Sequence, residues 1–163
     1  MRATLVDTGP LVAFLNRRDR HHRWAVDTMA RFRPPLLTCE AVLSEAVYLV
    51  RALPGGGEAV MEMLQRGVVR AVFRLEEEAA AVRTLLAKYG DVPMDLADAC
   101  LVRMTEIYAE PILITVDAEF RDIYRRHGRK VIPTLLPDGA TRARRKRKRN
   151  RGSDSRASRA SRP

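Results

Sequence analysis

ATLVDTGPLVAFLN, residues 3–16, is the stretch that decides how this chain folds. It opens with an apolar run, Ala3–Val6, of the kind that forms a buried strand, and Asp7 follows directly. Thr8-Gly9-Pro10 then supplies residues typical of a turn and a helix start. A carboxylate at the carboxyl end of a buried parallel strand lies where open α/β sheets bind their ligands. Asp7 therefore indicates a functional site, although it would equally serve as the N-cap of the following helix.

Strand and helix signals alternate along the first 137 residues. Short apolar runs predict further strands at Leu36–Thr38, Val68–Phe73, Ile112–Thr115 and Val131-Ile132. Amphipathic or capped stretches predict helices over residues 21–33, 40–51, 58–66, 76–89, 95–108 and 118–127. This alternation predicts an α/β fold whose parallel sheet is covered on both faces. The length suits one domain with a sizeable core.

The charge is distributed unevenly between the body and the end of the chain. The formal net charge is +10, but residues 138–163 hold 11 Lys/Arg and 2 Asp, whereas residues 1–137 hold 19 Lys/Arg and 18 Asp/Glu. The terminal segment contains no Val, Leu, Ile, Met or aromatic residue, so it cannot bury enough apolar surface to fold. We therefore expect a globular domain over residues 1–137 and a disordered basic tail over residues 138–163.

The basic run of the tail, Arg142–Arg151, is typical of segments that bind nucleic acid. The residues expected to contact RNA phosphates are Arg144, Arg145, Lys146, Arg147, Lys148 and Arg149. The alternative is a solvated tail that only aids solubility.

Several classes of protein are disfavoured by composition. No run of about 18 apolar residues is present, which argues against a transmembrane helix, and no basic region followed by an apolar stretch suggests a secretory signal. Cys39 and Cys100 lie within apolar or helical patterns and are expected to be buried thiols in a reducing compartment. We therefore expect a cytoplasmic protein without a zinc site.

Glu45 is the second acid of interest, because it is the only charged residue within residues 41–50, AVLSEAVYLV. A carboxylate in so apolar a helix is costly if it is buried without a partner. Two interpretations stay open: Glu45 lies on a narrow exposed stripe with Ser44 and Tyr48, or it points into a polar site where a cation offsets its charge.

Three further acids occupy comparable positions. Asp95 and Asp98 are three residues apart, which places both on one face of the predicted helix. Both also have ordinary structural roles, as an N-cap and as a first-turn acid. Asp117 follows an apolar strand, as Asp7 does, so the two acids are expected at the same edge of the sheet. Carboxylates that converge in this way repel one another unless a hard cation neutralises them. Oxygen donors of this kind suit Mg²⁺ or Mn²⁺, which can activate water and stabilise phosphoryl charge.

Four segments occur along the chain in a fixed order: LVDTGPLVAFLN, SEAVYLV, DLADACLV and ITVDAEF. The ordered set resembles PIN domains, most closely the VapC-type toxin ribonucleases, over about residues 3–133. The resemblance assigns the catalytic and metal-binding acids to Asp7, Glu45, Asp98 and Asp117. Asp95 matches an accessory acid of some members, and Thr115 matches a small hydroxyl residue that often precedes the last acid by two positions.

The resemblance implies a three-layer α/β/α sandwich and an endoribonuclease that hydrolyses RNA phosphodiester bonds with Mg²⁺ or Mn²⁺. It also implies a homodimer, and its toxin members imply a cognate antitoxin protein that blocks the site. The basic tail departs from the compact toxin pattern.

Two other functions are compatible with the residues. A phosphohydrolase could use Asp7 as a nucleophile, but such enzymes usually carry Asp-x-Asp, and Gly9 stands at the second position here. A non-catalytic RNA-binding protein could keep the fold and use the tail alone. Metal-stimulated cleavage that disappears when the acids become amides discriminates against the latter.

Overall fold

A computed structural model describes residues 2–92 and 94–140 of the chain, so the basic run at 142–151 lies outside the described residues. The strands are β1 (Arg2–Val6), β2 (Leu36–Thr38), β3 (Val69–Ala71), β4 (Glu110–Ile114), β5 (Arg125–Arg126), β6 (Lys130–Val131) and β7 (Thr134–Leu135). The helices are α1 (Thr8–Leu15), α2 (His22–Met29), α3 (Glu40–Leu49), α4 (Gly56–Gln65), α5 (Leu75–Lys88), α6 (Leu96–Ile107) and α7 (Glu119–Asp122).

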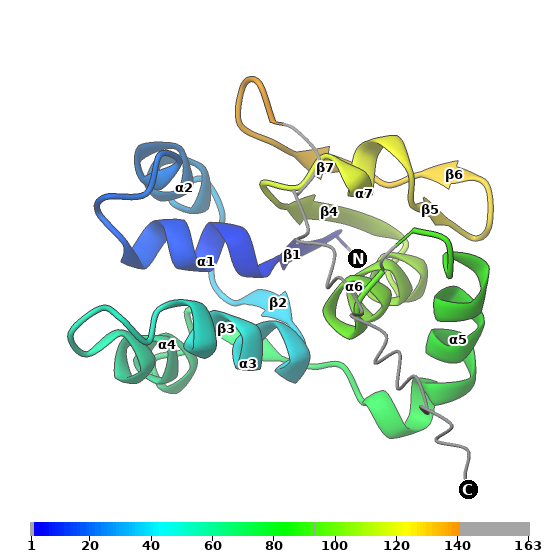
Figure 1. The fold of residues 1–163 in the computed structure, drawn as a ribbon, viewed down its shortest axis with the longest axis horizontal. Helices are drawn as coiled ribbons and strands as arrows, with labels where there is room; N and C mark the ends of the chain where they lie inside the picture. The colour runs from blue at the N-terminus through cyan, green and yellow to red at the C-terminus, as the bar shows by residue number, and fades with distance from the viewer. Residues whose placement is uncertain (1, 93, 141–163) are drawn as a thin grey trace, which may run out of the picture.

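Five strands form one parallel sheet in the order β3-β2-β1-β4-β7 (Figure 1). β1 lies at its centre and pairs along its whole length with β4, from Arg2 beside Glu110 to Val6 beside Ile114. The sequence order reverses at this pair, since β2 and β3 lie on one side of β1 while β4 and β7 lie on the other. Ligands of open α/β sheets bind at such a switch point, beyond the carboxyl ends of the strands.

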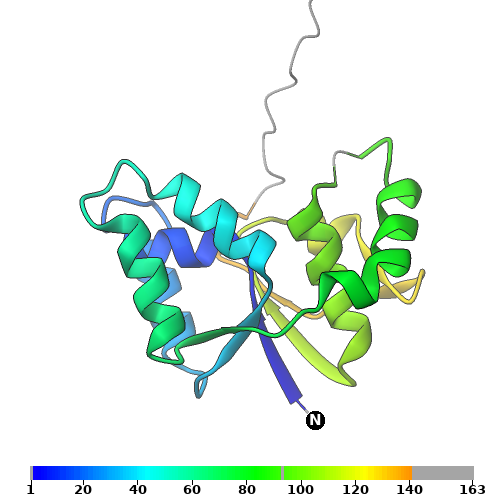
Figure 2. The same ribbon diagram turned by 90° about the horizontal axis from the view of Figure 1, so that it is seen from below.

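Helices cover both faces of the sheet. In Figure 2, α1 to α4 lie on one side of the strands and α5 to α7 on the other, which gives the three-layer α/β/α sandwich expected. This division follows from right-handed crossovers that run in opposite directions from β1. Leu5 and Val6 of β1 and Leu113 and Ile114 of β4 are fully buried, as expected for central strands between two helical layers.

The predicted helix over residues 118–127 is wrong. α7 covers only Glu119–Asp122, and the chain then forms a separate antiparallel hairpin of β5 and β6. His127 and Gly128 both adopt positive φ, at 47° and 76°, which a helix does not permit and a tight hairpin loop requires. The predicted last strand, Val131-Ile132, is also misplaced: Val131 belongs to the hairpin, and β7 completes the main sheet.

Other boundaries differ by a few residues. α2 ends at Met29, four residues before the predicted end, and α4 begins at Gly56 rather than at residue 58. β4 includes Pro111, although the strand was predicted to begin at Ile112. β7 pairs with β4 only from Leu113 onward, so the missing amide of Pro111 removes no bond from the ladder. No helix among the described residues is long and apolar enough to cross a membrane.

Candidate active site

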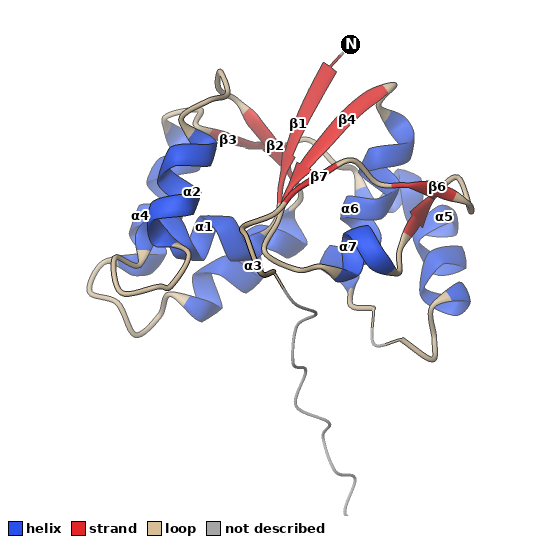
Figure 3. Cartoon of the chain, turned by 90° about the horizontal axis from the view of Figure 1, so that it is seen from above, coloured by secondary structure: helices blue, strands red, loops and turns tan. Residues whose placement is uncertain are grey.

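Asp7 directly follows β1 and is the N-cap of α1. Figure 3 shows β1 at the centre of the sheet, between β2 and β4. Asp7 is also a buried acid, with 7% of its surface exposed. The amide of Thr8 donates to its Oδ1 at 2.7 Å, and the hydroxyl of Thr115, beyond the end of β4, donates to its Oδ2 at 2.7 Å. Asp7 therefore caps α1 with one oxygen and contacts Thr115 with the other, so its capping role does not exclude a role in a functional site.

The surroundings of Asp7 disfavour its charged form. Burial is the largest influence and raises the pKa of its carboxyl group from 3.8 to about 7. The hydrogen bonds from Thr115 and Thr8 lower the pKa, whereas the charges of Asp98 and Glu45 raise it further. Acids from α3 and α6 therefore lie close enough to Asp7 to oppose its ionisation, as expected for converging carboxylates.

Glu45 reaches the site although it is exposed. Ser44 and Tyr48 are exposed as well, so the narrow polar stripe expected on α3 is present. From that stripe the Glu45 Oε2 atom accepts a hydrogen bond of 2.7 Å from the Thr8 hydroxyl, one residue beyond Asp7. The interpretation as an exposed stripe is confirmed, and exposure removes the cost of burying Glu45. The hydrogen bond from Thr8 ties Glu45 to the carboxyl edge, and a cation that offsets its charge stays a prediction.

The two cysteines lie on the helices that carry Glu45 and Asp98. Cys39 precedes α3 and Cys100 lies in α6; both are free and buried, as predicted. The neighbouring Cys39 thiol and burial raise the pKa of Cys100.

Asp98 is held at the start of α6 by a capping box. The amide of Asp98 donates to Asp95 Oδ1 at 2.9 Å, and the amide of Asp95 donates back to Asp98 Oδ2 at 3.3 Å. Asp95 is the N-cap, and Asp98 is buried with 6% of its surface exposed. A first-turn acid needs no burial to favour a helix, so the burial of Asp98 beside Asp7 is not explained by capping.

Asp117 is linked to Asp7 through its backbone amide and the Thr115 hydroxyl, whereas its carboxylate contacts the start of α7. The amide of Asp117 donates to the Thr115 hydroxyl at 3.0 Å, and that hydroxyl donates to Asp7. The Asp117 Oδ1 atom accepts from the amide of Glu119 at 2.8 Å, so Asp117 also orders the start of α7. Gly9 lets the start of α1 lie close to the loop between Thr115 and Asp117. A Cβ atom at Gly9 would lie 2.3 Å from Val116 Cγ2 in that loop.

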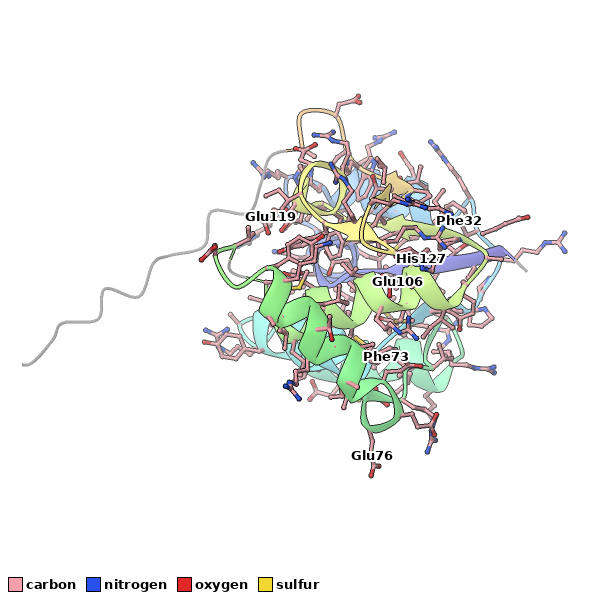
Figure 4. All side chains as sticks on the ribbon, turned by 90° about the vertical axis from the view of Figure 1, so that its right-hand side faces the viewer. Phe32, Phe73, Glu76, Glu106, Glu119 and His127 are labelled. Carbon is pink, nitrogen blue, oxygen red and sulfur yellow. The ribbon has the colours of Figure 1, made fainter. Side chains whose placement is uncertain are left out.

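Two residues of the site were missed by the sequence analysis. Tyr124 is fully buried, and its hydroxyl lies 3.2 Å from Asp98 Oδ2 and 2.9 Å from Glu119 Oε2. Glu119 is 5% exposed and lies on α7 (Figure 4). The ITVDAEF segment contains Glu119 and was the signal in the sequence that could have pointed to it. No spacing rule connects Glu119 with Tyr124, because the chain leaves the helix between them.

The acids are linked through hydroxyls and backbone amides rather than gathered in a closed cage. Among the residues that the structure describes, no three His, Cys, Asp or Glu side chains are grouped so that they could hold a metal ion. The donor chemistry fits Mg²⁺ or Mn²⁺, because Mg²⁺ keeps several waters and needs only one or two carboxylates. Each carboxylate oxygen offers two lone pairs, so the hydrogen bonds to Asp7 do not use up its acceptor capacity.

These features define a doubly wound α/β protein with acids from four elements at the carboxyl edge of its sheet. The PIN domain family model matches residues 4–126, and the chain belongs to the PIN domain family. The crystal structure of VapC20 from Mycobacterium tuberculosis, described as a sarcin–ricin loop cleaving toxin, matches with a TM-score of 0.60. Sequence identity is 20%, and the match covers 68% of this chain and 87% of that chain. No curated protein matches the chain.

The raised pKa of Asp7 predicts how metal-free stability varies with pH. Between about pH 4 and about pH 7 the folded state keeps a proton that the unfolded chain has released, so the free energy of unfolding falls as pH rises. The whole contribution is up to about 4 kcal/mol, at about 1.4 kcal/mol per pKa unit. Asp7→Asn removes it, so urea unfolding with a chelator should show the variant gaining stability over the parent as pH rises.

Asp27→Asn is the matched control, because Asp27 is exposed on α2 and pairs only loosely with Arg23, at 3.9 Å. Its profile should parallel that of the parent. Parallel profiles for the parent and Asp7→Asn would contradict the raised pKa.

Proposed function

We propose that this chain is a metal-dependent endoribonuclease that hydrolyses RNA phosphodiester bonds at the carboxyl edge of its sheet. The observation that carries the proposal is the buried Asp7 carboxylate, placed beside Asp98 and linked through Thr8 to Glu45. An acid that only capped a helix would gain nothing from two neighbouring acids, because their charges oppose its ionisation. Family membership supports a nuclease over other chemistry.

Asp7 and Asp98 are the residues that we expect to hold Mg²⁺ or Mn²⁺, with Glu45 and Asp117 contributing directly or through water. A divalent cation bound there would supply Lewis acidity, making a water more acidic and offsetting charge on the phosphate. The hydroxyls of Thr8 and Thr115 orient the carboxylates, since each donates to an acid from a different element. The accessory Asp95 fixes the start of α6 through the capping box.

A nucleophilic role for Asp7 is less compatible with this geometry. Both of its oxygens accept short hydrogen bonds, and the side chain is buried, which hinders direct attack on a phosphorus atom. The aspartyl-phosphate alternative therefore has less support than hydrolysis by an activated water.

We further propose that RNA is the substrate and that the basic run at 142–151 contacts its phosphates. The cognate antitoxin, the homodimer, the disordered state of the tail and the cytoplasmic location stay predictions. A toxin role would require a partner that covers the carboxyl edge and silences the nuclease.

Replacing the central acids should abolish cleavage. Asp7→Asn and Asp98→Asn each remove one charge and almost no volume, so metal-dependent cleavage of mixed RNA should fall by at least about 100-fold while the protein stays folded. Asp95→Asn should have a milder effect, because an Asn still caps a helix well. Cleavage is measured with Mg²⁺, with Mn²⁺ and with a chelator, and folding by circular dichroism.

Glu62→Gln is the control, because Glu62 is an exposed acid on α4 that pairs with Arg66. It should cleave at the parental rate. Full activity in both Asp7→Asn and Asp98→Asn would remove the proposal, and RNA binding without cleavage by the parent would favour the non-catalytic alternative.

Deleting residues 141–163 should weaken RNA binding without removing cleavage at saturating RNA, because every proposed metal ligand precedes residue 118. Each contact to a single-strand phosphate contributes about −0.7 to the slope of log K against log salt concentration. If about five basic residues bind at once, deletion should flatten that slope by about 3 to 4. Affinity is measured across a salt series in an Asp7→Asn background, which prevents cleavage.

Substituting Gln for the Lys and Arg residues of that segment at full length should reproduce the deletion, which separates charge from length. Equal affinities and parallel salt dependences for the parent and both variants would show that the tail does not bind RNA.

A further inference from the structure

The Tyr124 hydroxyl lies within hydrogen-bond distance of both buried acids on the α6–α7 side of the site. It lies between Asp98 Oδ2, at 3.2 Å, and Glu119 Oε2, at 2.9 Å. The ring is fully buried and packs edge-to-face against Tyr89 and Phe120, with centroid distances of 5.2 Å and 5.3 Å. The aromatic contacts fix where the hydroxyl stands, independently of the acids.

Two contacts to Asp98 converge on one oxygen. Oδ2 is approached by the amide of Asp95 at 3.3 Å and by the Tyr124 hydroxyl at 3.2 Å. An amide on the helix's own backbone and a phenol from another element together define the rotation of the carboxylate about its Cβ–Cγ bond. The charge of Asp98 raises the pKa of Asp7, and both acids are proposed to hold the cation. The orientation of the Asp98 carboxylate therefore affects the proposed cation position.

Glu119 competes for the same proton. It lies at the start of α7, where its amide donates to Asp117 Oδ1 and its Oε2 atom faces the phenol. A phenol has one proton and cannot donate to two acids at once. When the proton is donated to Asp98, the Oδ2 atom accepts from the phenol and from the Asp95 amide together.

We propose that Tyr124 is a positioning residue, which sets the orientation of Asp98 for the divalent cation. This inference rests on the proposed nuclease function. Groups that orient metal-binding side chains in this way affect metal affinity about 10- to 100-fold when they are removed. A fully buried phenol does not touch RNA, so it acts on the site and leaves substrate binding unchanged.

The test is Tyr124→Phe in the full-length chain. The ring and its contacts with Tyr89 and Phe120 are kept, and only the hydroxyl is lost. We expect Mn²⁺ affinity, measured by calorimetry, to fall by about tenfold or more. At fixed sub-saturating Mn²⁺, kcat for RNA cleavage should fall by a similar factor while KM for RNA stays unchanged, and raising Mn²⁺ should restore much of the rate.

Tyr89→Phe is the matched control. Tyr89 belongs to the same aromatic cluster and is also buried, but its hydroxyl accepts from the amide of Arg125 instead of facing an acid. It should bind Mn²⁺ and cleave RNA as the parent does. An equal loss in both variants would overturn the proposal, because the effect would then come from general destabilisation.

Substitutions at Glu119 separate positioning from ligation. Glu119→Gln and Glu119→Ala each remove the carboxylate that competes for the Tyr124 proton, so Mn²⁺ affinity should stay close to the parental value or rise. A loss of affinity in both variants as large as in Tyr124→Phe would overturn the proposal, because Glu119 would then be the group through which the phenol acts on the cation.

The failures are distinguishable. A parent chain that neither binds Mn²⁺ nor cleaves RNA would refute the proposed function, and the inference with it. A parent that does both, alongside a Tyr124→Phe variant with unchanged affinity and kcat, would refute the positioning role alone.

Discussion

The hydrogen bond from the Thr115 hydroxyl to Asp7, across 108 residues of sequence, is the interaction on which the rest of the site depends. It exists because β1 and β4 pair in parallel with Val6 beside Ile114, which places the residues that follow each strand at the same edge. Through Thr115 it fixes the loop that carries Asp117, and through Asp7 the start of α1, where Thr8 reaches Glu45. One strand pairing thus determines where Asp7 and Asp117 lie relative to each other.

Much of this arrangement could be predicted from local sequence, because it depends on local chemistry. The apolar run before Asp7 specifies a buried strand, and the Asp95–Asp98 spacing specifies the capping box that the structure contains. The parallel sheet follows from the alternation of strands and helices. Glu45 was the harder case, since the sequence showed a lone acid without showing that an exposed residue could still contact Thr8.

Other features could not be predicted, because they depend on contacts between distant segments. Residues 118–127 were predicted to be a helix, yet His127 and Gly128 form a hairpin loop that connects β5 and β6. That error hid Tyr124, whose side chain packs in the core and reaches Asp98 only because the chain leaves α7 after Asp122. Buried acids beside one another oppose folding in the absence of a cation, so the charge of Asp98 near Asp7 costs the metal-free chain stability.

The central claim is that Asp7 and Asp98 form a position for a divalent cation. Anomalous diffraction from crystals grown with Mn²⁺ tests it most directly, because the anomalous signal identifies the metal and locates it in one measurement. The account predicts a peak within coordination distance of carboxylate oxygens of both Asp7 and Asp98, with the Thr115 contact to Asp7 retained. Manganese bound only elsewhere, with the carboxyl edge of the sheet empty, would contradict it.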